Sequence, residues 1–484
     1  MTRPTSGPLS WRVRLMFAAG QIPEGVQSTS FGFFLLFFYN QVLGLSGFMT
    51  SLAIVVALLV DAISDPVIGS WSDSLRSRWG RRHPFMYAGA IPFAISFYLL
   101  FAPPAGMTEL QTFAWLVVFS VLTRTTQSVY SIPHSSLTAE LSPDYQERTL
   151  LSSLRSLLQS IGNLMVFLIG FQIFFDATPE YPVGQLNPDA YPNFSLFFSV
   201  IIFFGVALTA SGTHSYIPHL PKANEDSRGF SLIRVVREAL MAFSFRSFKS
   251  VVLTAVLFGM TMGMVSALSI YLGTLYFQFS LELIGLSFPA SIAGSFIGAA
   301  LATPLGRLFD EKKTLLIIGL MWFGLWNTLP IILSLLDLFL KPGDPMLFYL
   351  VMTANAISAM GIGLLSVMIG SMIADITDQH EERFGSRNEG IYFAASSFAT
   401  KAISGAGVVI SGVVIDLAGI QRNATVETID EDSLHTLAFA MGPGVLLMIG
   451  CTVLAAVFYD LSKAEHSRIR SSLGTHERNL LSKR

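Results

Sequence analysis

Charge is scarce in this sequence. Only 13% of the 484 residues are Asp, Glu, Lys or Arg, whereas about a quarter of an ordinary soluble domain is charged. The net charge is −2, so no excess of either sign would attract nucleic acid, and we expect none as a partner. A single cysteine, Cys451, excludes an intrachain disulfide framework and a cysteine-rich metal cluster.

Motifs for catalysis are also missing. The chain contains no G-K-[ST] phosphate loop, no HExxH motif and no Cys/His spacing suited to zinc. We therefore expect neither an enzyme nor a cofactor. The first residues, MTRPTSGPLSWRVR, lack the pattern of a cleavable signal, so the first apolar stretch is expected to remain as a membrane span.

Apolar residues are abundant instead. They make up 52% of the chain, and forty residues are phenylalanine, which indicates an integral membrane protein surrounded by lipids. A helix needs roughly 20 apolar residues to cross a bilayer, and a count of only ten spans would leave long apolar runs in water. The predicted fold is all-α, with twelve transmembrane helices near residues 14–40, 48–72, 84–103, 110–133, 152–175, 194–217, 250–278, 284–306, 314–338, 346–374, 389–415 and 435–459.

The basic residues predict the orientation of these spans. With the N-terminus inside, twenty-five of the thirty Lys and Arg residues fall on the inner side, and only Lys341 and Arg422 lie in outer loops. Because Lys and Arg favour cytoplasmic loops, we expect a multi-pass protein of the inner (plasma) membrane with both termini in the cytoplasm.

A long polar segment separates the sixth span from the seventh. Its second part, FSLIRVVREALMAF, repeats apolar residues at helical spacing and suits a helix on the inner membrane surface. The first ten residues of the segment are equally compatible with a solvated linker. The expected organisation is a six-helix bundle at 1–217, a cytoplasmic linker at 218–249, a second six-helix bundle at 250–459 and a cytoplasmic tail at 460–484.

A short motif recurs at the same loop of each half. Gly69 is followed after three residues by Asp73 and a basic run that includes Arg81 and Arg82, and Gly306 is followed in the same way by Asp310 and Lys312. The two aspartates stand 237 residues apart, about half the chain. An acid at this place can cap a helix or pair with neighbouring cations. We expect both motifs to form a cytoplasmic gate that holds the inner ends of the two halves together.

At these motifs the sequence resembles the major facilitator superfamily, whose two six-helix halves alternate access around a central site. More narrowly, it resembles the glycoside, pentoside and hexuronide cation symporters, the group that includes the melibiose carrier. The matching motifs are DAISDPxxG at 61–69, SRWGRRHP at 77–84, SIPHSSL at 131–137, ER at 147–148 followed by Arg155, ADITD at 374–378, RNEG at 387–390, and Lys401.

The resemblance implies that Asp61 and Asp65 are paired cation-coupling acids. Their spacing of four residues presents both carboxylates on one face of a helix. Two anions held so close favour sharing a proton or a bound Na⁺, although a structural pair is the alternative. Ser128 falls where the family can place a hydroxyl ligand, or it is a small residue for helix packing.

The same resemblance supplies candidate substrate contacts. Glu24 lies close to the position of the family's sugar-binding aspartate. Lys401 matches a family lysine, with a structural ion pair as the alternative. Arg155 matches a family arginine, with snorkelling from a span end as the alternative. On the fourth span the family's aspartate and tryptophan are replaced by Ser131 and Ser135. The helical spacing puts four polar residues on one face of this span: Arg124, Ser128, Ser131 and Ser135. Because this polar stripe replaces the family's aspartate and tryptophan, an anionic or differently shaped substrate becomes credible.

The charges between the tenth and eleventh spans are expected to lie in a loop and to belong to the cytoplasmic gate. They are Asp375, Asp378, Arg387 and Glu389. The leading hypothesis is a monomeric, H⁺- or Na⁺-coupled symporter of a sugar, a glycoside or a related polar solute. The alternatives are a lipid or lysolipid carrier on the same fold and a non-transporting membrane sensor.

Overall fold

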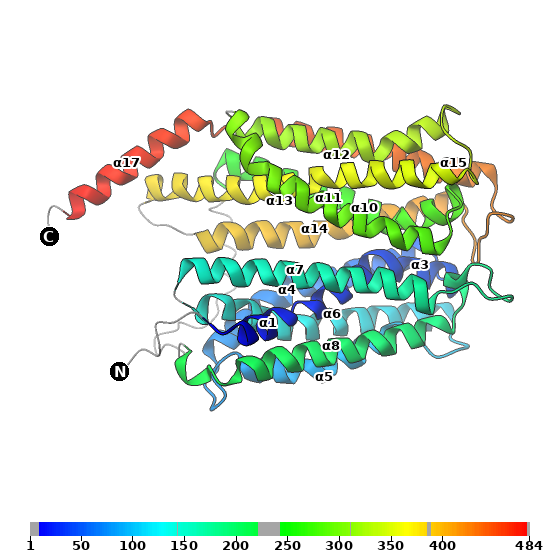
Figure 1. The fold of residues 1–484 in the computed structure, drawn as a ribbon, viewed down its shortest axis with the longest axis horizontal. Coiled ribbons are helices and arrows are strands. Elements are labelled where there is room, and N and C mark those ends of the chain that lie inside the picture. Colours follow the sequence, from blue (N-terminus) through cyan, green and yellow to red (C-terminus); the bar gives the residue numbers. More distant parts are fainter. Residues whose placement is uncertain (1–8, 143, 221–242, 310, 385–388, 482–484) are drawn as a thin grey trace.

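The computed structural model describes residues 9–142, 144–220, 243–309, 311–384 and 389–481. Within these ranges the chain forms helices and connecting turns, without a strand. The long helices run side by side, and the first and last helices lie at one end of the molecule, at the left of Figure 1. We call this the termini end and the opposite end the far end.

The first half of the chain crosses the molecule six times. The first crossing is divided into short pieces, two of which are π-helical, and the other five crossings are long helices. Their bounds are α1 (Trp11–Ala19), α2 (Ile22–Thr29), η1 (Ser30–Phe34), α3 (Leu35–Phe37), η2 (Phe38–Val42), α4 (Gly47–Ser74), α5 (His83–Leu100), α6 (Glu109–Glu140), α7 (Tyr145–Ile169) with η3 (Gly170–Phe174), and α8 (Ala190–His214), besides the short turns η4 (Gly184–Leu186) and η5 (Ile217–His219).

The second half also crosses six times and ends in a helix beyond the bundle. The amphipathic helix predicted from FSLIRVVREALMAF falls almost entirely on residues outside the described ranges. The bounds of the helices are α10 (Arg246–Tyr271) with η6 (Leu272–Tyr276), α11 (Leu281–Leu308), α12 (Lys312–Leu335), α13 (Pro345–Phe384), α14 (Glu389–Leu417), α15 (Glu431–Phe439) with η7 (Ala440–Gly444) and α16 (Val445–Val457), and finally α17 (Lys463–Leu481).

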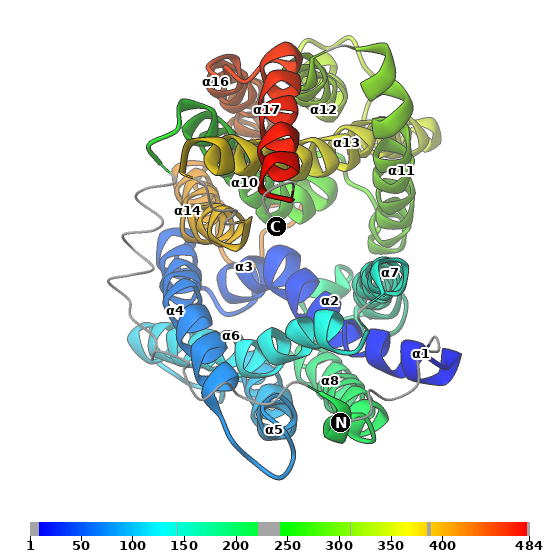
Figure 2. The same ribbon diagram turned by 90° about the vertical axis from the view of Figure 1, so that its left-hand side faces the viewer.

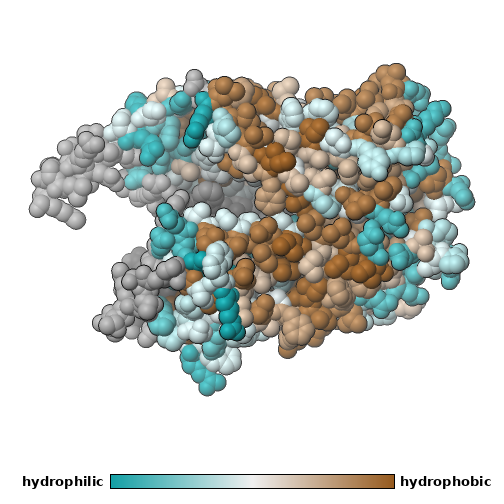
Figure 3. Space-filling model, viewed as in Figure 1, coloured by the Kyte–Doolittle hydropathy of each residue, from teal (hydrophilic) through white to brown (hydrophobic). Residues whose placement is uncertain are grey.

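Each of the twelve predicted spans coincides with one crossing. Over the described residues, nine helices are long and apolar enough by length and composition to cross a membrane. The first crossing is interrupted, α6 carries Arg124 and many hydroxyl residues, and the described apolar part of α14 is the shorter stretch Gly405–Leu417. The face seen in Figure 3 carries a broad band of hydrophobic side chains, with hydrophilic groups towards both ends. These features are those of a multi-pass membrane protein.

Helix α13 corrects one prediction. Asp375 and Asp378 were expected in a loop, but α13 continues to Phe384 and carries both. The sequence ADITDQHEERF contains no glycine or proline that would stop a helix, so the helix extends past the apolar segment. Only residues 385–388 separate α13 from α14.

The helices form two groups (Figure 2). Helices α2, α4, α5, α6, α7 and α8 pack mainly on one another, as do α10, α11, α12, α13, α14 and α16. The two groups meet where α4 packs on α14, α7 on α11, and η1 on α10. On the basis of this packing we propose that the chain is divided into two helix bundles, residues 1–217 and 250–459.

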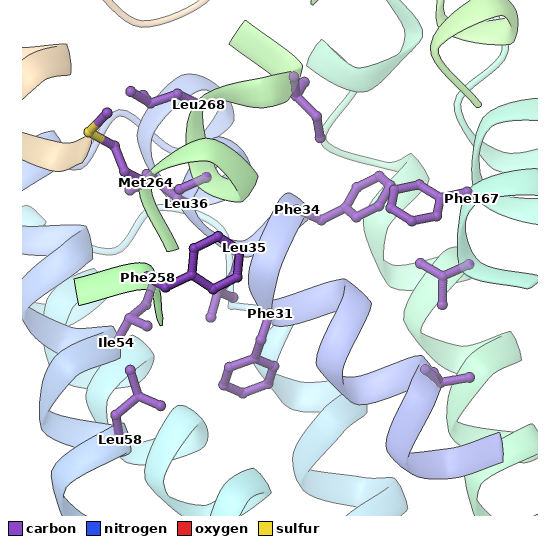
Figure 4. Packing of buried hydrophobic residues seen from close by; sticks show 14 of the residues in the cluster. Phe31, Phe34, Leu35, Leu36, Ile54, Leu58, Phe167, Phe258, Met264 and Leu268 are labelled. Carbon is purple, nitrogen blue, oxygen red and sulfur yellow. The ribbon is translucent and has the colours of Figure 1, made fainter. Parts of the chain in front are cut away.

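The first crossing lies at the centre of this contact. Figure 4 shows Phe34 of η1 directed towards Phe167 of α7, and Phe31 on the side of Ile54 and Leu58 of α4. The rings of Phe34 and Phe167 are 6.1 Å apart. π-Helical turns occur frequently at functional sites, and Phe31 and Gly32 of η1 line the cavity described below.

Candidate functional site

Asp61 is the buried acid at the centre of the first half. It lies on α4 and is only 3% exposed. The hydroxyl of Ser128 donates to its Oδ1 at 2.8 Å, and Nη1 of Arg124 donates to its Oδ2 at 3.3 Å. Ser128 and Arg124 lie one turn apart on α6, so α6 holds the carboxylate through both of its oxygens. Asp65 follows one turn later on α4, towards the termini end.

A cavity of about 310 Å³ opens beside Asp61. Arg124, Ser128 and Ser131 of α6 line it, together with Glu24 of α2 and Gln159 of α7. We call it the charged cavity. The guanidinium of Arg124 lies over the ring of Phe31 at 5.0 Å, and its Nε is buried without a hydrogen-bond partner among the described residues. The guanidinium at the cavity wall is thus held between the Asp61 carboxylate and the Phe31 ring.

Arg155 organises the part of the site nearer the termini end. Its Nε donates to Gln21 Oε1 at 3.0 Å, its Nη1 to Thr138 Oγ1 at 2.9 Å and its Nη2 to Ser135 Oγ at 2.8 Å. Gln21 in turn donates to the Glu24 carboxylate. Arg155 lies inside α7, which begins at Tyr145, and these hydrogen bonds are to side chains of the first half.

The structure therefore brings most of the predicted site residues together. Asp61, Ser128, Arg124, Ser131 and Glu24 border one cavity. Ser135 continues the stripe of α6 but is directed to Arg155. Lys401 lies on α14, which packs against α4, and its side chain is outside the described part of the chain. Sequence reasoning missed Gln21 and Thr138, because small polar residues in a span carry no pattern that distinguishes packing from binding.

No group of three or more His, Cys, Asp or Glu residues that could hold a metal ion occurs within the described ranges. Asp61 accepts hydrogen bonds from Arg124 and Ser128 through its two oxygens. A Na⁺ ion at this carboxylate would compete with the arginine for the same anion. A cation could therefore bind Asp61 in place of Arg124, but the described residues around this carboxylate do not form a closed cage of oxygen ligands.

The first predicted gate motif forms an ion-pair cluster at the termini end. Arg82 pairs with Asp73, and Arg81 Nη1 lies 4.0 Å from the same carboxylate. Glu140, at the end of α6, accepts from Arg81 at 2.8 Å and from Arg82 at 2.9 Å. These contacts join α4, α5 and α6 of one half. Glu140 was not predicted, because only the fold brings the end of α6 to this loop.

The second half has a corresponding cluster. Lys312 Nζ, at the start of α12, donates to Asp375 Oδ2 at 2.6 Å and to Ser371 Oγ at 2.7 Å. His466 of α17 approaches Asp378 Oδ2 at 3.1 Å. Asp310 and Arg387 lie outside the described residues, and Glu389 begins α14 with an undescribed side chain. A latch that joins the two halves at this end stays a prediction.

The far end carries hydrogen bonds that do join the halves. The Asp416 carboxylate at the end of α14 accepts from the backbone N–H groups of Gly47 and Phe48 at 2.7 and 2.8 Å. Tyr271 donates to Asn40 Oδ1 at 2.9 Å. We call these contacts the far-end seal. The sequence offered only one indication of it, an acid at the end of the eleventh predicted span.

Comparison with known proteins identifies the family to which the sequence is similar. A model of the family "MFS/sugar transport protein" matches residues 16–463. An isoprimeverose transporter of Lactiplantibacillus pentosus is 24% identical, over 94% of this chain and 90% of its own. A glucuronide carrier protein homologue of Escherichia coli is 23% identical, over 86% of this chain and 85% of its own.

The fold resembles that of solved transporters. The crystal structure of a D-xylose–proton symporter superimposes with a TM-score of 0.65 at 16% sequence identity, and the match covers 93% of this chain and 97% of the other. These proteins are transporters and not enzymes.

Proposed function

The chain belongs to the family of MFS/sugar transport proteins, and we propose that it is a symporter that couples the movement of H⁺ or Na⁺ to that of a sugar or glycoside. One observation carries the proposal: the buried carboxylate of Asp61 lies in the wall of a cavity at the contact of the two halves, held by Arg124. An aspartate within a spanning helix costs roughly 2.5 to 3.5 kcal/mol, so a functional use outweighs a purely structural one.

The Asp61–Arg124 pair supplies a physical route for coupling. A proton or Na⁺ that binds Asp61 neutralises the charge that holds Arg124, 3.3 Å away. The guanidinium then becomes available to oxygens of a solute in the charged cavity. Cation binding and solute binding therefore favour each other, as coupled transport requires. In this proposal Asp65, one turn away on α4, shares the cation. Glu24, which lines the cavity, contacts the solute, and Arg155 acts through Gln21, which donates to Glu24.

The transport cycle would open the two ends of the bundle in turn. The far-end seal joins the halves at one end, and the distribution of Lys and Arg favours the termini end as the cytoplasmic side. We therefore propose that the charged cavity is closed towards the outer side in this state. We place the protein in the plasma membrane, surrounded by lipids, as a monomer with both termini in the cytoplasm.

A counterflow assay in proteoliposomes tests this function. A panel of xylosides, glucosides, galactosides and glucuronides is offered with and without Na⁺ and with a proton gradient. We expect at least one glycoside to exchange and to accumulate when a cation gradient is imposed. Movement of lysophospholipid without competition from any glycoside would favour a lipid carrier instead, and binding without movement would favour a sensor.

The far-end seal predicts a shift between states on mutation. Asp416→Ala removes a carboxylate that caps the N-terminus of α4 from the other half, and such a cap contributes about 1 to 2 kcal/mol. The outward-facing population should rise about five- to thirtyfold. With Cys451→Ser removing the sole cysteine, a Ser131→Cys reporter in the cavity should react faster with a reagent added at the far end.

The matched control is Asp430→Ala. Asp430 is likewise an acid at the N-terminus of a far-end helix, α15, but its side chain makes no capping hydrogen bond. Its labelling rate should stay at the wild-type value. Equal rates of cysteine labelling in the Asp416→Ala and Asp430→Ala proteins would show that the far-end seal plays no part in the transport cycle.

A further inference from the structure

The first crossing is interrupted between α1 and α2. Helix α1 ends at Ala19, and α2 begins at Ile22. Gly20 and Gln21 join the two helices, and we call them the junction. Pro23, in the first turn of α2, has no backbone N–H and cannot donate to the carbonyl of Ala19. The regular ladder of helical hydrogen bonds is therefore broken here, and carbonyl groups beside the junction take partners from other helices.

Two side chains of α6 supply these partners. The Tyr130 hydroxyl donates to the Gly20 carbonyl at 2.6 Å. His134 follows one turn later, and its Nε2 donates to the Phe17 carbonyl at 2.9 Å, because a carbonyl oxygen can only accept. The Phe17 carbonyl also accepts from Thr209 of α8 at 3.1 Å. Tyr130 and His134 are 1% and 0% exposed, so both hydrogen bonds are shielded from water.

The close approach of α6 depends on glycine at the junction. A Cβ atom at position 20 would overlap the Tyr130 hydroxyl oxygen and lie 2.9 Å from His134 Nε2. The backbone of Gly20 and Gln21 stays in the right-handed helical region, with φ of −61° and −85°. Because such a backbone does not exclude a straighter chain, we attribute the angle between α1 and α2 to the groups that contact the junction.

The junction leads directly to the charged cavity. Gln21 accepts from Arg155 Nε at 3.0 Å and donates to the Glu24 carboxylate. Glu24 lies in the first turn of α2 and lines the cavity. A different angle at the junction would therefore move this carboxylate relative to the residues of α6 that line the same cavity.

Helix α6 contacts the cavity and the junction through different residues. Ser128 and Ser131 line the charged cavity. Tyr130 and His134 do not line it and are directed to α1 and the junction. We propose that Tyr130 and His134 are positioning residues: their hydrogen bonds fix the junction and so hold Glu24 where it meets a glycoside. This inference rests on the proposed function and adds to it two residues that act without touching the solute.

Removal of one oxygen atom tests the proposal. Tyr130→Phe keeps the ring and deletes only the hydroxyl that bonds the Gly20 carbonyl. Purified full-length protein in nanodiscs is titrated calorimetrically with the methyl glycosides of xylose, glucose, galactose and glucuronic acid. Each glycoside that binds the wild-type protein should bind Tyr130→Phe at least fivefold more weakly.

The matched control is Tyr191→Phe. Tyr191 is also fully buried in the first half, and its hydroxyl donates to the Gln185 carbonyl at 2.9 Å. It does not line the charged cavity. This variant loses an equivalent hydrogen bond and should bind every glycoside as the wild-type protein does.

A double-mutant cycle distinguishes positioning of Glu24 from a general structural effect. If the hydroxyl acts by placing this carboxylate, Tyr130→Phe should weaken binding less than twofold in a Glu24→Gln background. A general structural effect would weaken binding equally in both backgrounds. His134→Gln, which keeps an N–H donor, should also bind the glycosides more tightly than His134→Leu, which has none. This second pair covers the case in which Tyr130→Phe fails to fold.

The outcomes separate the inference from the function on which it rests. Equal affinities in the Tyr130→Phe and Tyr191→Phe proteins, or equal weakening with and without Glu24, would overturn the positioning role and leave the symporter proposal standing. Equal affinities in the two His134 variants would remove His134 from the proposal. Absence of binding of every glycoside to the wild-type protein would overturn both the positioning role and the proposed function.

Discussion

Asp61→Asn is expected to abolish cation-driven accumulation of the solute while some exchange across the membrane persists. Asparagine has nearly the same shape as aspartate and can still accept a hydrogen bond from Ser128, but it can neither take up a proton nor balance a bound Na⁺. The cation gradient could then no longer drive accumulation of the solute. The measurement is uptake into proteoliposomes with an imposed gradient, compared with counterflow in the same vesicles.

Stability must be separated from coupling in this variant. Loss of the Asp61 charge leaves Arg124 without this partner in a nearly enclosed place, and breaking one side of a buried ion pair costs about 3 to 5 kcal/mol. The double variant Asp61→Asn/Arg124→Gln removes both charges and should recover thermal stability without recovering accumulation. Concentrative uptake by the single variant at the wild-type level would leave Asp61 with a structural role only.

Arg124→Gln is expected to weaken binding of an acidic solute at least tenfold more than binding of its neutral analogue. Arg124 borders the charged cavity, its guanidinium donates to the Asp61 carboxylate, and arginine is well suited to a second carboxylate supplied by a solute. A hydrogen bond to a charged group contributes about 1.5 to 3 kcal/mol. Binding of p-nitrophenyl glucuronide and of p-nitrophenyl glucoside, measured on the same preparations, gives the comparison.

The control variant for this prediction is Arg124→Lys, which keeps the charge but loses the planar fork of donors. It should retain more affinity for the glucuronide than Arg124→Gln does. The Arg124→Gln variant could instead be unstable. If adding Asp61→Asn then restores its stability, and restores binding of the two glycosides in equal proportion, the arginine acts only as the partner of Asp61. The anionic-solute hypothesis would then be abandoned.

The site was only partly predictable. The placement of Asp61, Ser128 and Arg124 within spans identified them as candidates, since a polar or charged group in a membrane helix is too costly to be incidental. Their actual contacts were not predictable, because a sequence shows which face of a helix is polar but not which helix lies opposite. For the same reason the sequence could not identify the acidic partner of Arg124, which the structure shows to be Asp61.

Contacts between distant segments were missed more generally. Arg14 and Glu147 form a bidentate pair at 2.8 Å that ties α1 to α7, yet they are separated by 133 residues and belong to no common motif. Glu140 completes the cluster of Arg81 and Arg82 only because α6 ends beside the loop after α4. The loop expected around Asp375 was wrong because hydropathy marks where a span leaves the lipid and not where its helix ends.

The sequence by itself determined that this chain crosses a membrane twelve times, in two halves related by a repeated motif. The periodicity, length and charge distribution of each segment are local properties, and the bilayer allows helices as almost the only response to them. Only the tertiary structure decided that Glu24, Asp61 and Arg124 line one cavity between helices of both halves, and that Asp416 joins the halves at the far end. The physical reason is that a cavity or an ion pair forms between helices, from residues whose neighbours are fixed by packing and not by their order along the chain.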